Sequence, residues 1–312
     1  MQNSKKWMFL VCLALFFLVP QVGFANEEGS SGEQEATERW DRLQIEEITV
    51  LSRAELVTGQ TLHGVVLGLQ SCSVLDCQGP RSYLGLPTLG GLIGLGGSLY
   101  LTQNGVAPGH TSLMNSATLW GGLLGLRVGE LAGVPYDNVV LVAMAGQGLG
   151  LAGGWLIGEL ARPTSGDVAM MNHSAIWTTA LVLLITRGVL DLSFSNTVED
   201  VSWIALPAVG ATLGALGASA YPMSRARTRV VSAAGAVGAL VGLTVPFLIF
   251  EDSLSPRVGA AGTALGALGG LGTAWYFTSQ WDQEYREAGA LHFAVMPDRE
   301  RHGLSLLVGG QF

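Results

Sequence analysis

Charged residues are scarce in this sequence. They make up 13% of 312 residues, against 49% apolar residues, and the formal net charge is −8. This acidic balance argues against nucleic acid as a partner, because phosphate binding needs a positively charged face. The high apolar content also excludes an intrinsically disordered chain, since disorder requires low hydrophobicity.

The sequence also lacks the usual marks of a catalytic or metal site. Its five histidines form no His-x-x-x-His pair, and no serine lies in a Gly-x-Ser-x-Gly elbow. The segment 146–150, Gly-Gln-Gly-Leu-Gly, superficially resembles a nucleotide loop, but it has neither a preceding strand nor a phosphate-binding lysine. We therefore expect no enzyme activity, no cofactor and no metal.

Cysteine is rare, with three residues in the chain. Cys12 lies in the apolar N-terminal run, whereas Cys72 and Cys77 share one short loop. In an oxidising compartment two such neighbours can form a local disulfide, and two free thiols are the alternative. We predict a disulfide between Cys72 and Cys77.

The N-terminus is typical of a secretory signal peptide, residues 1–25. Lys5 and Lys6 precede an apolar run over residues 7–19, and small residues precede the expected cleavage point after Ala25. An uncleaved membrane anchor is the alternative, although the apolar run is short for a bilayer span. We therefore predict an exported protein.

The mature chain begins with a predicted acidic segment, residues 26–51. Its acidic residues are Glu27, Glu28, Glu33, Glu35, Glu38, Asp41, Glu46 and Glu47. We expect this segment to be a solvated tail, because a run of like charges repels itself in a compact fold.

Glycine is abundant, with 44 residues, which is about twice its usual share. An internal repeat accompanies it. Asn115 and Trp120 recur 57 residues later as Asn172 and Trp177. A related copy begins at Gln60, and in it His63 stands where the two copies that follow have tryptophan, so we expect His63 to be a packing residue. A fourth copy begins near residue 228. A repeat of this length indicates tandem supersecondary units.

A second glycine-rich element follows each of these segments, with glycines spaced four and then three residues apart. The twelve positions are Gly90, Gly94, Gly97, Gly146, Gly150, Gly153, Gly210, Gly214, Gly217, Gly262, Gly266 and Gly269. This spacing places them on one helical face. Glycine costs a helix about 1 kcal/mol against alanine, so we expect a neighbouring helix to pack closely on that face. We also expect alanine to be tolerated better than leucine at Gly94.

The sequence thus predicts a mainly α fold of four tandem glycine-rich helical hairpins, about eight helices, in residues 52–280. The expected repeats cover about 52–107, 108–164, 165–224 and 225–280. The first helices are expected near 53–70, 111–128, 168–187 and 229–250, and the second near 83–102, 138–158, 201–221 and 258–278. Pro80 and Pro108 are expected to break the chain between helices.

The tail, residues 281–312, is expected to hold a short β-hairpin. Its last residues alternate in polarity and end at Phe312. A terminal phenylalanine on an alternating strand resembles the assembly signal of outer-membrane barrel proteins, although other aromatic residues are lacking. The glycine-rich repeats resemble glycine-zipper repeat proteins of the Gram-negative envelope. These resemblances imply a location in the cell envelope.

Membrane insertion is the expected setting of the helices. Segments 84–102 and 139–158 contain no charge, and about twenty such residues cross a bilayer core of about 30 Å. Charges gather at the helix ends and allow local pairing: Arg127 with Glu130, Glu159 with Arg162, Arg187 with Asp191, and Arg257 with Glu251 or Asp252. A soluble stacked array and a β-barrel remain alternatives.

These observations predict a non-enzymatic structural or interaction protein of the cell envelope. Membrane lipid is the expected partner, together with envelope proteins or further copies of the chain. Inner membrane, outer membrane and a soluble periplasmic location stay open. The alternative is a channel or transporter in which Asn115, Gln147, Asn172 and His173 line a polar path between helices.

Overall fold

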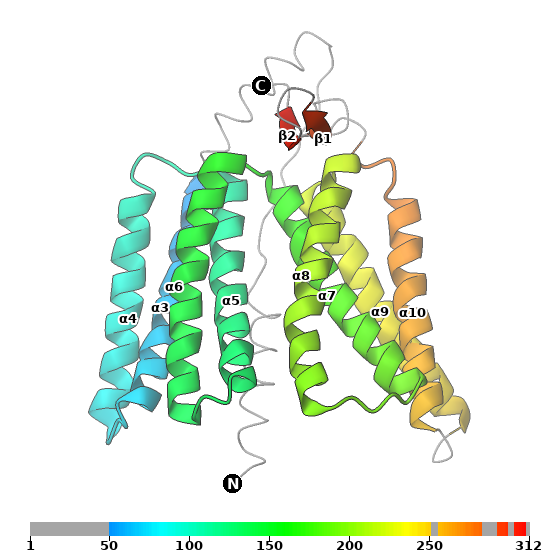
Figure 1. Cartoon of the computed structure of the whole chain (residues 1–312), viewed down its shortest axis with the longest axis horizontal. Helices are drawn as coiled ribbons and strands as arrows, with labels where there is room; N and C mark the ends of the chain where they lie inside the picture. Colours follow the sequence, from blue (N-terminus) through cyan, green and yellow to red (C-terminus); the bar gives the residue numbers. More distant parts are fainter. Residues whose placement is uncertain (1–49, 251–254, 283–291, 299–302, 310–312) are drawn as a thin grey trace. The chain divides into compact units, whose positions relative to one another are not determined.

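The computed structural model describes residues 50–250, 255–282, 292–298 and 303–309, all within one compact unit of residues 43–312. The predicted signal peptide, the acidic residues of segment 26–51 and Phe312 lie outside the described residues. The described part is mainly helical, which confirms the predicted fold class at that level. It contains eight α-helices, α3 to α10 (Figure 1).

The helices follow one another with short connections. Their bounds are α3 (Val50–Val74), α4 (Pro80–Leu101), α5 (Pro108–Leu131), α6 (Tyr136–Ala161), α7 (Ser165–Leu183), α8 (Asn196–Ala220), α9 (Arg225–Phe250) and α10 (Pro256–Phe277). A π-helical segment, η1 (Leu184–Val189), continues α7. The tail contains β1 (His292–Asp298) and β2 (Gly303–Gly309), which pair antiparallel with Val295 opposite Leu306.

Each helix begins a few residues earlier than the sequence predicts. Pro80 and Pro108, expected as breaks between helices, are the first residues of α4 and α5. Proline suits this position because the first helical residue has no intrahelical use for an N–H group. At α7 the cap is Thr164, whose hydroxyl accepts a hydrogen bond from the amide of Asp167, and the Asp167 carboxylate accepts one from the amide of Thr164.

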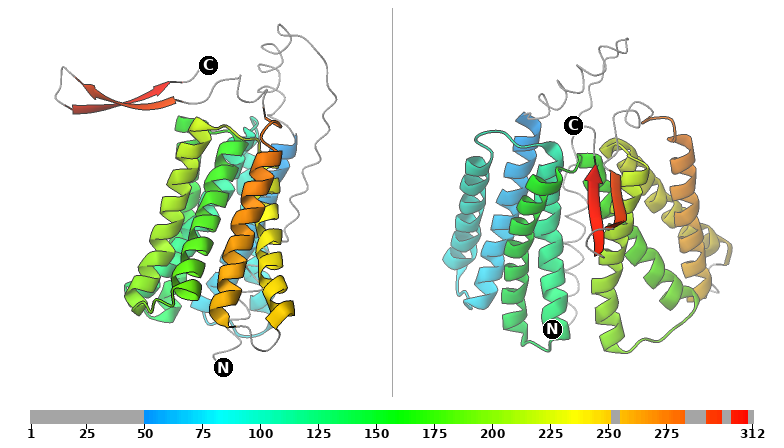
Figure 2. Two further views of the ribbon diagram at one scale, coloured as in Figure 1. Left: turned by 90° about the vertical axis from the view of Figure 1, so that its right-hand side faces the viewer. Right: turned by 45° about the horizontal axis from the view of Figure 1, so that its top comes forward.

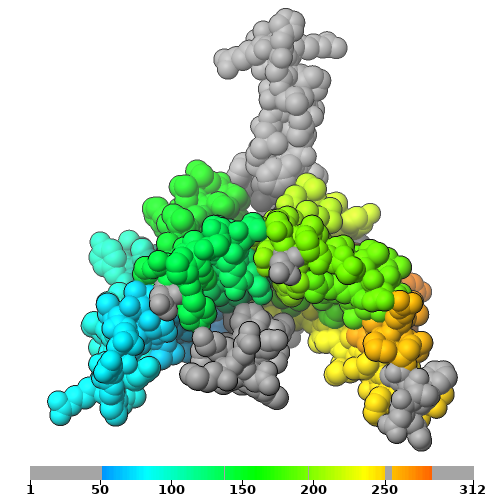
Figure 3. Space-filling view, turned by 60° about the horizontal axis from the view of Figure 1, so that its bottom comes forward, coloured from blue at the N-terminus to red at the C-terminus, as the bar shows by residue number. Residues whose placement is uncertain are grey.

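The helices pack as four antiparallel pairs, α3–α4, α5–α6, α7–α8 and α9–α10. We call α3, α5, α7 and α9 the first helices, and α4, α6, α8 and α10 the second helices. All first helices run in one direction and all second helices in the other, as two further views confirm (Figure 2). Seen from the end where the first helices finish, the pairs follow in chain order (Figure 3).

Contacts between neighbouring pairs run through the first helices. α3 contacts α5, α5 contacts α7, and α7 contacts α9. In addition, α6 contacts α3, α8 contacts α5, and α10 contacts η1. Among the described residues no extensive contact joins two second helices. Each second helix is therefore held mainly by first helices and by η1, the continuation of α7.

The interior is built mostly from small side chains, with a few larger ones such as Leu56 and Met114, and most of the large apolar side chains point outward. Ala143, Ala175 and Ala267 are fully buried, whereas Leu84 and Leu149 are 70% and 75% exposed. Five helical segments are long and apolar enough to cross a membrane: Pro80–Leu101, Asn138–Ala161, Ser165–Val189, Thr197–Ala220 and Arg225–Ile249. Only 11–22% of their apolar windows is buried inside the protein, so most of this surface faces outward.

Candidate functional site: the contacts of the first helices

Within three pairs, glycine from the first helix lies directly against glycine from the second. A Cβ atom built on Gly64 would lie 2.1 Å from the carbonyl oxygen of Gly90, and one built on Gly121 would lie 2.2 Å from that of Gly146. In the fourth pair a Cβ on Gly238 would lie 2.1 Å from the oxygen of Gly266. Real Cβ atoms essentially never come closer than 3.0 Å to another atom in this way. Backbone therefore touches backbone at these positions.

The twelve glycines named from the sequence divide into three groups. Eight meet the backbone of the partner first helix: Gly90, Gly94, Gly146, Gly150, Gly210, Gly214, Gly262 and Gly266. Gly217 meets only the end of the Met170 side chain. Gly97, Gly153 and Gly269 have nothing within 4 Å of an added Cβ. The third position of the four-then-three spacing therefore takes little part in the helix interface.

The contact stripe instead continues in steps of four residues. After Gly94 and Gly150 it passes to Ser98 and Gly154, and after Gly214 it passes to Ala218, all of which are buried. Small residues in steps of four are the pattern of closely packed helices in membranes. The stripe is thus longer than the glycines alone indicate, because alanine and serine are small enough to continue it.

The packing also assigns a different register to two of the pairs. Added Cβ atoms at Gly94, Gly150, Gly210 and Gly270 lie 2.0–2.5 Å from the carbonyl oxygens of Gln60, Ala117, Ser174 and Ala234, respectively. These four partners are spaced by the 57 or 60 residues of the sequence repeat. Gly210 therefore occupies the place of Gly94, although the glycine pattern equates it with Gly90.

The fourth pair is displaced by one turn in the opposite direction. Gly266, and not Gly262, occupies the place of Gly90, because it is Gly266 that meets Gly238. In the third pair Leu206 stands at that place, and the facing helix carries Thr178 where α5 has Gly121. Residue identity alone cannot show this shift, since several glycines one turn apart satisfy the same spacing.

Polar side chains join α3 to α5. The Gln60 Nε2 donates to Asn115 Oδ1 at 2.9 Å, and Asn115 Nδ2 donates to the backbone oxygen of Glu55 at 3.3 Å. The Thr111 hydroxyl donates to the backbone oxygen of Ser52 at 3.3 Å. Asn115 therefore connects neighbouring first helices.

The recurring asparagine and tryptophan do the same between later pairs. Trp120 Nε1 donates to Asn172 Oδ1 at 3.1 Å, and Asn172 Nδ2 donates to Ser116 Oγ at 2.6 Å, joining α5 to α7. Trp177 Nε1 donates to Ser232 Oγ at 2.9 Å, joining α7 to α9. The repeated residues seen in the sequence are thus those that link one first helix to the next.

Side chains from all four first helices converge near the beginning of the helices. Both guanidinium Nη atoms of Arg225 donate to the carboxylate of Glu55 at 2.6 Å, although 170 residues separate the two. The Ser112 hydroxyl donates to the same carboxylate at 3.4 Å. His173 lies within electrostatic range of Arg225 and Arg229. We call Glu55, Ser112, His173, Arg225 and Arg229 the convergence cluster.

The convergence cluster brings together residues that sequence reasoning kept apart. His173 was expected on a polar path, whereas the helix predicted near 229–250 begins at Arg229 and leaves Arg225 in the connection before it. Arg225 instead belongs to α9, because Ser224 caps the helix: its hydroxyl accepts a hydrogen bond from the amide of Arg227 at 3.2 Å. The sequence did offer a signal for this earlier start, because Ser224 is of a residue type that commonly caps the beginning of a helix.

Arg227 forms a separate, buried connection between α9 and the end of α10. Its Nη1 lies 3.3 Å from the Asp282 carboxylate, and both side chains are about 96% buried. Its Nε donates to the Thr278 hydroxyl at 3.1 Å, and its guanidinium stacks over the Trp275 ring at 5.2 Å. Because the guanidinium is paired, bonded and stacked, its charge is accommodated without water.

Ion pairs at the opposite end differ from most of those predicted. Arg127 pairs with Glu130 as expected, with 2.8 Å between Nη1 and Oε2. Arg187 pairs with Glu199, however, and Arg257 with Asp191. The predicted Arg187–Asp191 pair does not form. Asp191 adopts a left-handed conformation after η1, with φ of 54°, which turns the chain at the point where its carboxylate meets the next pair of helices.

The predicted Glu159–Arg162 pair is also replaced. Glu159 lies 3.8 Å from Nδ1 of His110 on the preceding helix α5. Burial lowers the pKa of His110 below its ordinary value, and the negative charge of Glu159 opposes that effect. Arg162 follows the last residue of α6 and has a left-handed backbone, with φ of 44°, which ends the helix.

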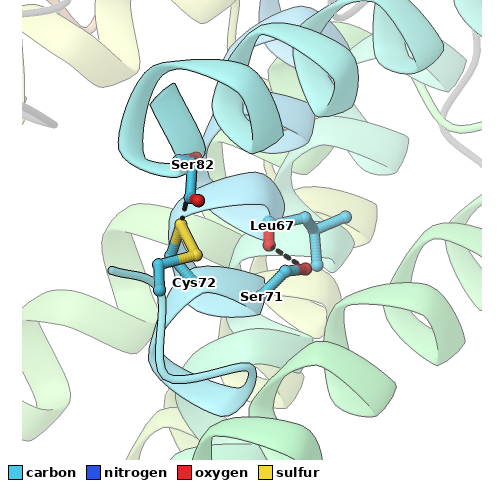
Figure 4. Close-up of a disulfide and its surroundings, with 5 residues drawn as sticks. Leu67, Ser71, Cys72 and Ser82 are labelled. Carbon is cyan, nitrogen blue, oxygen red and sulfur yellow. Dashed lines mark hydrogen bonds between the residues drawn. A yellow bond between two sulfur atoms is a disulfide. The ribbon is translucent and has the colours of Figure 1, made fainter. Parts of the chain in front are cut away.

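The structure places Cys72 and Cys77 at disulfide distance, as predicted (Figure 4). Their Cα atoms are 4.9 Å apart at the end of α3. Sγ of Cys72 also lies 3.3 Å from the carbonyl oxygen of Ser82, a close contact in which a disulfide sulfur has no hydrogen to donate. A shallow surface depression beside the disulfide is lined by the α3–α4 connection and the start of α4.

Three of the four polar residues predicted to line a path are hydrogen-bonded between helices, whereas the fourth, His173, has a buried Nδ1 without a hydrogen-bond partner in the described part of the chain. Asn115 and Asn172 bond to neighbouring first helices, and Gln147 Nε2 donates to Gln70 Oε1 at 3.0 Å, joining α6 to α3. Within the described ranges, no group of three or more His, Cys, Asp or Glu residues could hold a metal ion. Comparison with known protein families, curated proteins and solved structures finds no match to this chain.

Proposed function

We propose that this chain is a membrane-embedded protein of the cell envelope that serves as a structural or interaction scaffold without catalytic activity. The observation that supports membrane insertion is the inverted distribution of side-chain size. Most large apolar residues, such as Leu149 and Leu213 at 75% and 56% exposed, point outward, while small residues such as glycine, alanine, serine and threonine make up most of the interior. In water such a surface would drive association, whereas lipid tails cover it without cost.

We further infer that the four helix pairs are tandem copies of one glycine-rich unit. The recurrence of equivalent backbone contacts every 57 or 60 residues supports this proposal. The recurring Trp–Asn and Trp–Ser hydrogen bonds support it independently. A glycine interface gives helices tight packing in a lipid environment, where the hydrophobic effect does not drive one helix against another.

A scaffold is favoured over a polar conduction path by the use made of the polar side chains. The amides of Asn115, Asn172 and Gln147 are hydrogen-bonded to adjacent helices, which fixes the order of the pairs. Export rests on the predicted signal peptide in residues 1–25. The partners we propose are membrane lipid and either other envelope proteins or further copies of this chain.

Membrane insertion can be tested by fractionation and by labelling. The protein should stay with the membrane through a carbonate wash, and density separation would then assign the inner or outer membrane. In intact membranes a water-soluble maleimide should label a Ser193→Cys variant, in the exposed α7–α8 connection, but not a Leu213→Cys variant on α8. Release by carbonate, or equal labelling at both positions, would overturn the proposal.

A further inference from the structure

A half-buried positive charge lies beside the ion pair of the convergence cluster. Arg229 follows Arg225 by about one turn of α9, and across the described ranges no hydrogen bond or ion pair reaches its guanidinium. Glu55 is the nearby carboxylate, but Arg225 already engages both of its oxygens and Ser112 engages one of them as well. Glu55 is therefore poorly placed to serve Arg229 in addition.

His173 supplies an unused polar atom at the same place. Its Nδ1 is buried and has no hydrogen-bond partner in the described part of the chain. Arg225 and Arg229 both act on His173 electrostatically, and Arg225 and Glu55 act on Arg229. The cluster thus holds two guanidinium charges against one carboxylate, beside an imidazole nitrogen that needs a partner. An uncompensated charge away from water is costly, so an anion is the missing component.

We propose that Arg229, Arg225 and His173 bind a phosphate-type anion. A guanidinium fork matches the oxygens of phosphate, and a tetrahedral anion has enough oxygens for Arg229, the outer N–H groups of Arg225 and an N–H on His173 Nδ1 together. One negative charge also balances the excess of one positive charge in the cluster. The phosphate is either that of a lipid headgroup or free phosphate, and the test below distinguishes the two.

The depth of the cluster fits a lipid headgroup in particular. Arg225 is the first residue of α9, and Arg229 lies about 6 Å further along the helix. In a membrane-embedded array this is the depth at which phosphate groups and helix ends meet. The lipid form of the proposal rests on the proposed function, whereas binding of free phosphate does not.

The test is thermal unfolding of the full mature chain in a neutral detergent, for the wild type, Arg229→Gln and a control, Arg53→Gln. Arg53 is an exposed arginine on α3, near the cluster but outside it. Each protein is measured alone, with inorganic phosphate, and with micelles containing phosphatidylglycerol or phosphatidylcholine. Because Arg229 lacks a partner, Arg229→Gln should unfold at a temperature equal to or above that of the wild type when no anion is added.

Anion addition should reverse that order. The wild type and Arg53→Gln should gain about 2–4 °C with the bound form of phosphate, while Arg229→Gln gains nothing. A gain with phosphatidylglycerol but not with phosphatidylcholine or free phosphate identifies the lipid headgroup, and a gain with free phosphate alone identifies the soluble anion. No gain in the wild type, or equal gains in all three proteins, would overturn the proposal. Binding of free phosphate without binding of phosphatidylglycerol would keep the site and overturn only its lipid form, whereas release by the carbonate wash would overturn membrane insertion and leave the site standing.

Discussion

The second helices are richer in glycine and more apolar than the first helices, and the two sets have different roles. First helices exchange hydrogen bonds through Gln60, Asn115, Asn172, Trp120 and Trp177, whereas second helices contribute mainly a glycine face toward their partners and leucine toward the outside. Close backbone packing holds each pair together and carries little information about which pair lies beside it. Directional hydrogen bonds between first helices supply that order, because each donor needs its own acceptor.

The α9–α10 pair departs most from this division, because the buried contacts of Arg227 with Asp282, Thr278 and Trp275 also hold it together. Replacing Arg227 by methionine should lower the free energy of unfolding by about 3–5 kcal/mol, because Asp282 would be left buried without its partner. Arg257→Met is the matched control: its pair with Asp191 is 63% and 67% exposed, and its loss should cost about 0–1 kcal/mol. Both free energies are measured by unfolding in detergent. Equal losses in the two variants would show that the buried Arg227–Asp282 pair stabilises the fold no more than an exposed pair does.

Glycine contacts within a pair should give the next largest effect. At Gly146 even alanine should destabilise the fold by about 1–3 kcal/mol, because its Cβ would lie 2.2 Å from the Gly121 carbonyl oxygen. The same holds at Gly94, where a Cβ would lie 2.2 Å from the Gln60 oxygen, so alanine should be costly there and the larger leucine more costly still.

The matched control for Gly146→Ala is Gly153→Ala, on the same helix. Gly153 has open space around an added Cβ, so alanine there should be neutral or stabilising by up to about 1 kcal/mol through its higher helix propensity. The contrast is read from the two melting temperatures. If both variants melt alike, close backbone packing is not what holds α5 to α6.

The disulfide sharpens the comparison within the first pair. Replacing both Cys72 and Cys77 by serine should cost about 2 kcal/mol or less, since a cross-link between residues only five apart restricts the unfolded chain little. The change should be seen as a small fall in melting temperature that reducing agent reproduces in the wild type. A loss as large as that of Gly94→Ala, at the α3–α4 contact itself, would mean that the disulfide contributes as much to the first pair as close glycine packing does.

The smallest expected effect concerns the order of the pairs. Trp120→Phe removes the indole N–H that donates to Asn172, and should cost about 0.5–1.5 kcal/mol. Trp155→Phe is the control, because Trp155 lies on the second helix α6 and is 47% exposed. A double-mutant cycle of Trp120→Phe with Asn172→Ala measures the coupling. A coupling energy near zero would contradict the role given to the first helices.

Much of the helical arrangement follows from local signals in the sequence. Apolar runs between Pro80, Pro108 and Pro163 define helices of about the observed length, and the close spacing of Cys72 and Cys77 predicts their pairing. The recurrence of Asn115 and Trp120 as Asn172 and Trp177 marks the repeat. These features depend on residues near one another in the chain, which is why a sequence alone reveals them.

The sequence by itself therefore determined helix positions, their pairing as hairpins and the choice of small residues for their interface. Only the tertiary structure decided the register of that interface, the ion pairs of Arg187 and Arg257, and the meeting of Glu55 with Arg225. Glycines one turn apart are interchangeable in a pattern but not in contact, because each carbonyl oxygen meets a single partner. Likewise, a carboxylate and a guanidinium 170 residues apart meet only after α3, α5, α7 and α9 have packed in order.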